Sequence, residues 1–285
     1  MQKFYSNGKL LLTAEYVVLD GAKALAVPTK FGKNIIVKIL SVAKQLPKHT
    51  RETKDIIPFV KLWMQGQETR FQRKVLKLFE GAGVDRRYSI MDAEEVFLNS
   101  SFEDKNNIYV REVTTLAEQS LKKSLEKASL QPTDIDYIIT VSCTGIMIPS
   151  VDAYLINSLQ MRQDIVRLPV TEMGCAAGVS GIIYAKNFLQ ANPNKRAAVI
   201  AVESPTATFQ LEDFSMVNIV SAAIFGDGAA SVILSSYEED KGPKIIDEAM
   251  YHFYDSTHMM GFKLVNSGLQ MILDKSVPES REKLK

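Results

Sequence analysis

The sequence contains few of the residues that mark redox, metal-binding or disulfide-stabilised proteins. Its 285 residues include only two cysteines, Cys143 and Cys175, and three histidines. Two cysteines in so long a chain do not form a disulfide framework, and neither lies in a Cys-x-x-Cys or Cys/His pattern with metal-ligand spacing. We therefore expect no disulfide scaffold and no metal site.

The sequence also lacks an excess of charge and a long apolar run. Its 34 basic and 33 acidic residues leave a net charge of +1, so the whole molecule has no general attraction to nucleic acid or to an anionic membrane. No apolar run approaches the ~20 residues that span a bilayer, and the opening MQKFYSNGK lacks the apolar core of a signal peptide. These features predict a cytoplasmic protein that binds neither nucleic acid nor membrane.

The first 37 residues differ in pattern from the rest. Short β-type runs alternate with turn pairs such as Asn7-Gly8 and Asp20-Gly21, which is typical of hairpins. Through Gly8–Leu12, Glu15 and Gly21 this segment resembles the opening of the GHMP kinases, the galactokinase, homoserine kinase and mevalonate kinase group. The Gly/Ser-rich phosphate loop of those kinases does not occur in the sequence. We interpret residues 1–37 as a GHMP kinase-like N-terminal fragment, with kinase function a minor alternative.

Strand-type runs and amphipathic helix patterns alternate through most of the remaining chain. The expected strands are Ile35–Val42, Asp136–Ser142, Ile165–Thr171, Arg196–Val202 and Phe225–Leu234. The expected helices are Ile57–Met64, Glu68–Glu80, Asn106–Ser129, Val151–Gln160, Cys175–Gln190 and Phe214–Ile224. This alternation predicts an α/β fold with a parallel sheet covered on both faces.

The last fifty residues predict a second part. The segment Ser235–Lys244 is charged and rich in turn residues, so it is the best internal boundary. A second set of strands is expected from Lys244, and a helix is expected to begin at Leu269.

Cys175 occupies a distinctive position in the stretch Leu168–Gly181, which reads as a strand, a tight turn and the start of a helix. Small residues on both sides of the cysteine allow a sharp bend. The free N–H groups and positive dipole end of a helix favour a thiolate at such a place. A free cysteine can equally be a small buried hydrophobe, and the local sequence does not decide between these two interpretations.

A cationic stripe is expected on the helix Glu68–Glu80. Arg70, Arg73 and Lys77 follow the spacing i, i+3 and i+7 and so share one helix face. A solvated surface explains such a face. The alternative is a clamp for phosphate groups, because guanidinium groups match phosphate oxygens in bidentate fashion.

Several separated motifs in residues 38–280 resemble the type III polyketide synthases, the chalcone and stilbene synthase group of the thiolase-fold condensing enzymes, in their bacterial form. The motifs occur in family order and at family spacing. They are Arg70-Phe71-Gln72-Arg73, Cys143-Thr144-Gly145 with Pro149, Met173–Gly178 and Phe225–Ala230. The resemblance implies a thiolase-like layered α-β-α fold. Residues 38–235 would form its N-terminal domain, and residues 236–285 the truncated start of its C-terminal half.

The resemblance also assigns roles to single residues. It implies that Cys175 accepts the acyl group and that Phe225 is the gatekeeping aromatic between the coenzyme A tunnel and the reaction chamber. The residues that grip coenzyme A phosphates would be Arg70, Arg73 and Lys77. The residues that shape the substrate pocket would be Thr144, Ile148, Phe225, Phe262 and Met271. Acyl-CoA and malonyl-CoA would be substrates with no permanently bound cofactor, and intact relatives are expected to be homodimers.

The family chemistry requires more than a cysteine. A His and an Asn polarise the malonyl thioester in this family, within a His-Pro-Gly-Gly segment and a Gly-Asn-x-Ser-Ser segment. Neither segment occurs in the sequence. We therefore expect an acyltransferase of the polyketide synthase kind whose activity is impaired by truncation. The alternative from another class is a non-catalytic fragment or a dimerisation module.

Overall fold

A computed structural model describes residues 9–11, 26–28, 35–98, 101–274 and 276–277. The chain divides into two compact units, 1–36 and 37–285. In the first unit, β1 (Lys9–Leu11) pairs antiparallel with β2 (Ala26–Pro28). The predicted turns Asn7-Gly8 and Asp20-Gly21, and Gly8, Leu12, Glu15 and Gly21 of the kinase-like pattern, lie outside the described residues.

A five-stranded sheet forms the centre of the second unit, in the order β3-β9-β8-β6-β7. Its strands are β3 (Lys38–Gln45), β6 (Tyr137–Val141), β7 (Val166–Val170), β8 (Arg196–Glu203) and β9 (Gly228–Ser235). β6 runs parallel to β7 and β8, as predicted, whereas β9 runs antiparallel to β8 and to β3. The chain re-enters the sheet with Gly228 opposite Glu203, where β8 ends. β9 therefore runs back along β8, and the sheet is mixed rather than wholly parallel.

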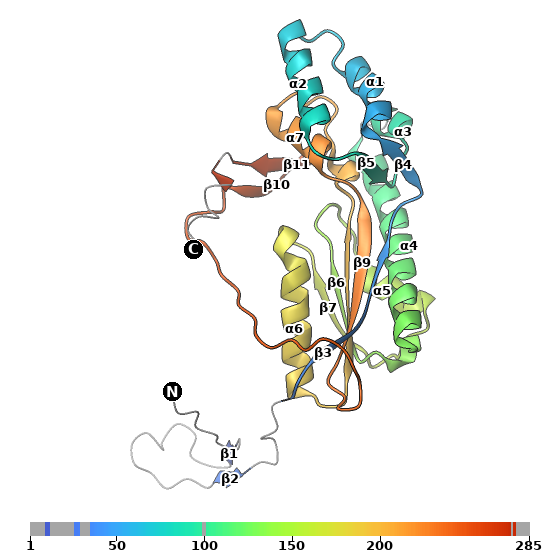
Figure 1. Ribbon diagram of the computed structural model, residues 1–285, viewed down its shortest axis with the longest axis vertical. Coiled ribbons are helices and arrows are strands. Elements are labelled where there is room, and N and C mark those ends of the chain that lie inside the picture. The colour runs from blue at the N-terminus through green and yellow to red at the C-terminus, as the bar shows by residue number, and fades with distance from the viewer. Residues whose placement is uncertain (1–8, 12–25, 29–34, 99–100, 275, 278–285) are drawn as a thin grey trace. The chain divides into compact units, whose positions relative to one another are not determined.

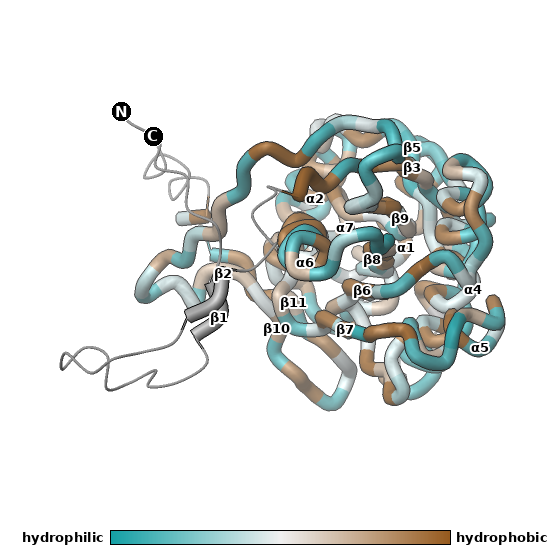
Figure 2. The backbone as a smooth tube through the Cα atoms, turned by 90° about the horizontal axis from the view of Figure 1, so that it is seen from below, coloured by the Kyte–Doolittle hydropathy of each residue, from teal (hydrophilic) through white to brown (hydrophobic). Residues whose placement is uncertain are grey.

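Helices cover both faces of this sheet. α4 (Phe102–Ala128) and α5 (Val151–Ser158) lie on one face, and α6 (Ala177–Ala191) lies on the other. Figure 2 looks along the strands and shows α6 on one side of β6 and β8, with α4 and α5 on the other side. These layers are the α-β-α arrangement that the resemblance implied.

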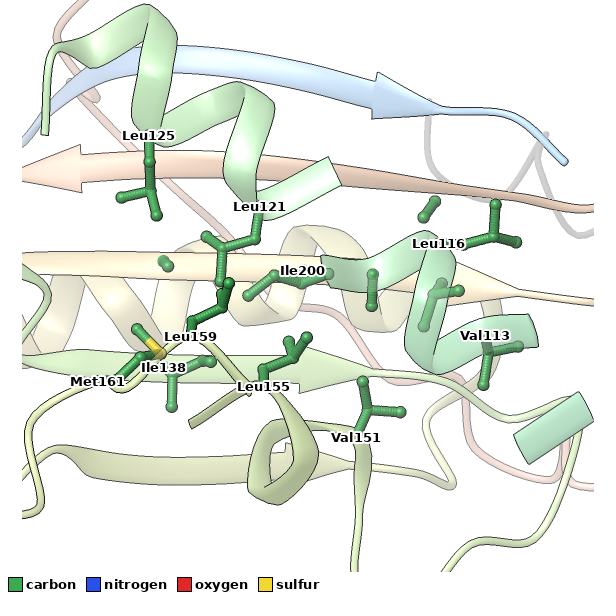
Figure 3. Packing of buried hydrophobic residues seen from close by; sticks show 14 of the residues in the cluster. Val113, Leu116, Leu121, Leu125, Ile138, Val151, Leu155, Leu159, Met161 and Ile200 are labelled. Atoms are coloured by element: carbon green, nitrogen blue, oxygen red, sulfur yellow. The ribbon is translucent and has the colours of Figure 1, made fainter. Parts of the chain in front are cut away.

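The core between α4, α5 and the sheet is continuous and apolar. Leu121 and Leu125 of α4 point toward the sheet, where Ile138 and Ile200 are fully buried (Figure 3). On the other face α6 approaches the sheet so closely that a Cβ on Gly181 would lie 2.9 Å from Cγ1 of Val199. A glycine at this position therefore allows the close packing of helix and sheet.

A smaller helical layer lies beyond one end of the central strands (Figure 1). Its elements are β4 (His49–Glu52), α1 (Thr53–Trp63), α2 (Thr69–Gly81), β5 (Arg86–Ser89), α3 (Ala93–Leu98) and α7 (Met216–Ile224). β4 and β5 form an antiparallel pair. Val75 and Phe79 of α2 are buried in one cluster with Ile219 and Ala223 of α7, so this layer has a small core of its own.

A second set of strands follows Lys244 as expected, but it begins only at Met260. Residues 245–259 form no strand, and Lys244 makes only an isolated bridge to Lys38. Ile246 is 82% exposed, so its side chain is not buried against the sheet. Leu269–Leu273, where the expected helix was to begin, lie instead in β11 (Gly268–Leu273), which forms a hairpin with β10 (Met260–Val265). Most of the remaining residues of that expected helix, 275 and 278–285, lie outside the described residues. Gly268 has a φ of +124°, which closes the turn of this hairpin.

Candidate active site

The functional side chains collect at one edge of the sheet. β6, β7 and β8 are parallel, so their carboxyl ends lie at the same edge, where α/β proteins place their ligands. Cys143 and Thr144 follow β6, and Cys175 follows β7. Glu203 ends β8, and Phe225 precedes β9, which begins at the same edge. The topology thus brings Thr144, Cys175 and Phe225 to one region.

Cys175 lies in the turn between β7 and α6, as the sequence predicts. Gly174 adopts a φ of +62°, a left-handed conformation that favours glycine. Cys175 is the middle residue of a short 3-10 turn, and α6 begins two residues later, at Ala177. Its thiol is free and exposed, and it lies next to the N-terminal end of α6, whose cap residue Ala176 makes no side-chain hydrogen bond. Because the cap residue provides no side-chain acceptor, the backbone N–H groups at this end of α6 can stabilise a negative charge on the Cys175 sulfur or on an oxygen atom of a bound substrate.

Cys143 has the opposite environment. Its backbone N–H donates to both carboxylate oxygens of Glu203, at 3.0 and 3.1 Å. Burial raises the pKa of Cys143 to about 12, helped by the charge of Glu203 and by the nearby thiol of Cys175. Cys143 therefore stays protonated at neutral pH, and Cys175 is the more exposed of the two thiols.

Glu203 organises the turn after β6 and was not predicted. Thr144 Oγ1 donates to Glu203 Oε2 at 2.6 Å and accepts from the backbone N–H of Ser204 at 2.7 Å. Burial raises the pKa of Glu203. Next to Cys143, the hydroxyl of Ser142 forms a hydrogen bond with the hydroxyl of Tyr109, with 2.5 Å between the two oxygens. Burial raises the pKa of Tyr109. The sequence signal for this network is Glu203 itself, a carboxylate directly after the apolar run 197–202.

Asp227 holds a second turn at the same edge. Its Oδ1 accepts from the backbone N–H and the hydroxyl of Thr206, at 3.0 and 2.8 Å, and its Oδ2 accepts from the backbone N–H of Ile90 at 2.8 Å. Burial raises the pKa of Asp227 to about 6. The carboxylate thus ties β5, the loop after β8 and the turn that follows Phe225 to one another.

Replacing Asp227 by asparagine is expected to destabilise the fold by about 1–3 kcal/mol, because the amide NH₂ would face an N–H donor. Urea unfolding measures this cost, and Asp85→Asn at an exposed position is the control. The pKa of Asp227 in the folded protein lies above the ordinary value of 3.8 for an aspartate. The folded state therefore keeps a proton that the unfolded chain loses, and stability from this group falls as pH rises from about 4 to about 6. Asp227→Asn should lose this change of stability between about pH 4 and about pH 6. Unchanged stability with an unchanged pH dependence would contradict the role assigned to Asp227.

The cationic stripe lies on α2 as predicted. Arg70, Arg73 and Lys77 are exposed, and none of them makes an ion pair with another described residue. The opposite face of α2 packs on α7, and Phe225 follows directly after α7. α7 therefore connects the helix that carries the stripe to Phe225, the residue for which the resemblance predicts a gatekeeping role.

The other pocket residues lie in different surroundings. Phe225 and Met271 line one cavity of about 140 Å³ between α1, the β4–β5 pair, α3 and α7. Phe262 is paired opposite Met271 across the hairpin. Ile148 is 93% exposed, and neither it nor Thr144 or Cys175 is among the described residues that line this cavity. The structure thus brings Phe225 and Met271 together and leaves Ile148 on the surface.

Within the part of the chain that the structure describes, no group of three His, Cys, Asp or Glu side chains is arranged to hold a metal ion. No described helix is long and apolar enough to cross a lipid bilayer.

Comparison with known proteins places this fold and this cysteine turn in one family. The family model for FAE1/type III polyketide synthase-like proteins matches residues 44–252, which is most of the chain. The chain belongs to this family. The matched residues include α2, the Cys143 and Cys175 turns and the Phe225 motif, and residues 1–37 lie outside them, so the kinase-like resemblance stays a prediction.

Individual relatives agree with this assignment. The chain is 32% identical over 209 residues to 1,3,6,8-tetrahydroxynaphthalene synthase of Streptomyces coelicolor, covering 73% of this chain and 56% of the relative. It is 28% identical over 204 residues to phloroglucinol synthase of Pseudomonas fluorescens, covering 72% and 58%. The chain thus spans little more than half the length of these relatives. The crystal structure of the Streptomyces coelicolor synthase superposes with a TM-score of 0.81 at 28% identity, covering 87% of this chain and 70% of that chain.

Proposed function

We propose that this protein is an acyltransferase of the type III polyketide synthase kind. It would load an acyl group from an acyl-CoA thioester onto Cys175 and extend it with units derived from malonyl-CoA. The observation that carries the proposal is the exposed thiol of Cys175 at the N-terminal end of α6, within the turn that the family model matches.

The loading step uses groups at the sheet edge. The Cys175 sulfur attacks the thioester carbonyl carbon, a new C–S bond forms, and the coenzyme A sulfur leaves and takes up a proton. Negative charge develops on the carbonyl oxygen during this attack, and the open N-terminal end of α6 favours that charge. In the extension step, malonyl-CoA loses carbon dioxide. Its enolate carbon then attacks the acyl carbonyl, and Cys175 is released as a thiolate.

The exposed stripe on α2 would bind the phosphates of coenzyme A. The double charge reversal Arg70→Glu and Arg73→Glu is expected to raise the KM for acyl-CoA at least about tenfold, because two cation–phosphate contacts become repulsive. Alkylation of Cys175 by iodoacetamide, which carries no phosphate, should not change. The double variant Lys241→Glu and Lys244→Glu, at two exposed lysines after β9, changes the net charge by the same amount and is the control. An equal rise in KM there would mean that the stripe has no special role.

The protein would form a homodimer, with an interface near the two cysteine turns. Apolar side chains are exposed around the cysteine turns, namely Ile146, Ile148, Met173 and Val179. Exposed apolar groups gathered in this way are typical of interfaces, and they support the homodimer that the family resemblance implies. Light scattering that gives the mass of a single chain would contradict the homodimer.

We also propose that the protein is cytoplasmic, because both of its thiols are free.

The experiment that tests the proposed function separates loading from extension. The purified protein is incubated with an acyl-CoA alone, and then with the same acyl-CoA plus malonyl-CoA, while released coenzyme A and products are measured by mass spectrometry. We expect release of coenzyme A in both incubations and new carbon–carbon-bonded products only with malonyl-CoA, formed slowly because the His and Asn segments that polarise the malonyl thioester do not occur in the sequence. Absence of both signals would contradict the proposal, and loading without products would restrict it to acyl transfer.

A further inference from the structure

A buried arginine without an acidic partner lies in the wall of the cavity beside Phe225. Arg87 belongs to β5 and is only 9% exposed. It makes no ion pair with any described residue: Nη1 donates to Thr53 Oγ1 at 2.8 Å, Nη2 donates to the carbonyl oxygen of Ala223, and Nε has no partner. Burial lowers the pKa of Arg87, which reflects the cost of keeping this charge away from water.

The remaining neighbours of Arg87 do not neutralise it. Its guanidinium lies 5.5 Å from the ring centroid of Phe79, a weak cation–π contact. Asp92 also lines the cavity, but its carboxylate binds Arg51 at 2.7 and 3.0 Å. A buried charge is normally paired and hydrogen-bonded, so Arg87 retains an unused N–H and an uncompensated charge.

The cavity itself is mostly apolar. Its volume is about 140 Å³, close to the size of cavity, about 150 Å³, that holds a benzene molecule. Aromatic side chains make up much of its wall, namely Trp63, Phe79, Phe97, Phe209 and Phe225. An apolar chamber with one unsatisfied cationic donor matches a small molecule that has an apolar body and one carboxylate.

We propose that this cavity binds a short apolar monocarboxylate whose carboxylate pairs with Arg87 and whose body packs between Trp63 and Phe225. This site is distinct from the Cys175 turn, since Cys175 does not line it. It does not depend on acyl transfer and would be occupied with or without a thioester on the enzyme. Because Phe225 and Met271 border it, a bound carboxylate would lie against the residues assigned to the gate and the substrate pocket.

The single tryptophan of the chain makes the site directly observable. Trp63 is that residue, and its ring lines the cavity, so its fluorescence should report occupancy without any catalytic step. Hexanoate and its neutral analogue hexanamide are titrated in the absence of coenzyme A. We expect hexanoate to bind at least about tenfold more tightly than hexanamide, the range of a charge-assisted hydrogen bond. No saturable change with hexanoate, or equal binding of the two, would overturn the proposal.

Variants assign the preference to Arg87. Arg87→Met should lose the preference for hexanoate, whereas Arg86→Met, at the exposed neighbour on the same strand, should keep it. Retention of the preference in Arg87→Met would overturn the proposal. If circular dichroism shows that Arg87→Met does not fold, Ala222→Leu fills the cavity while Arg87 remains. Loss of hexanoate binding in that variant supports the site, and unchanged binding overturns it. Cys175→Ala should bind hexanoate normally, which separates this site from the proposed acyl transfer.

Discussion

Replacing Cys175 by alanine is expected to abolish covalent acylation and to lower acyl-CoA-dependent release of coenzyme A by at least about 10³-fold, the scale seen when a nucleophile is removed. The physical reason is that the exposed sulfur next to α6 is the atom that forms the acyl bond. Release of coenzyme A is followed with a thiol reagent in a stopped assay, after the protein has been removed.

Cys143→Ala is the matched control, because it removes the other thiol at the same sheet edge. Its thiol is held protonated, with a pKa of about 12, so acyl transfer should fall far less than in Cys175→Ala. Equal activity of the Cys175 variant and the unsubstituted protein would refute the assignment of the nucleophile.

Iodoacetamide is expected to modify Cys175 long before Cys143. The reactive species is the thiolate. With its pKa near 12, Cys143 should react about 10³-fold more slowly than an unperturbed cysteine, whose pKa is about 8.5. Cys143 is also partly buried, whereas Cys175 is exposed. Peptide mapping after timed quenching at pH 8 measures the two rates separately.

The pH dependence provides an internal check on this difference. Below pH 12 the modification rate of Cys143 should rise about tenfold per pH unit, because the thiolate fraction does so. Comparable rates for the two cysteines at pH 8 would mean that Glu203 and burial do not hold the Cys143 proton.

Elements with strong local patterns were predicted well from the sequence. The cationic helix expected at Glu68–Glu80 is α2 (Thr69–Gly81), and the strand expected at Arg196–Val202 is β8 (Arg196–Glu203). Apolar periodicity and end signals determine such elements locally. The hairpin β10–β11 was missed because a short apolar run fits a helix or a strand equally well, and only the pairing of Phe262 with Met271 selects the strand.

The site was only partly readable from the sequence. The turn around Cys175 has a local signature, so its geometry was predicted. Glu203 and Arg87 were missed, because their importance comes from burial and from partners far away in the chain: Glu203 binds the turn after β6, and Arg87 donates to α7. Ile148 was assigned to the pocket by resemblance, yet it is exposed here, and its role stays a prediction.

The most direct test of the central claim is intact-mass spectrometry of the protein after incubation with acyl-CoA, followed by peptide mapping of any adduct. We expect a mass increase equal to one acyl group, located on the peptide that contains Cys175 and absent from Cys175→Ala. An adduct on Cys143 or elsewhere, or no adduct on a protein shown to be folded by circular dichroism, would contradict the proposal that Cys175 is the acyl-accepting nucleophile.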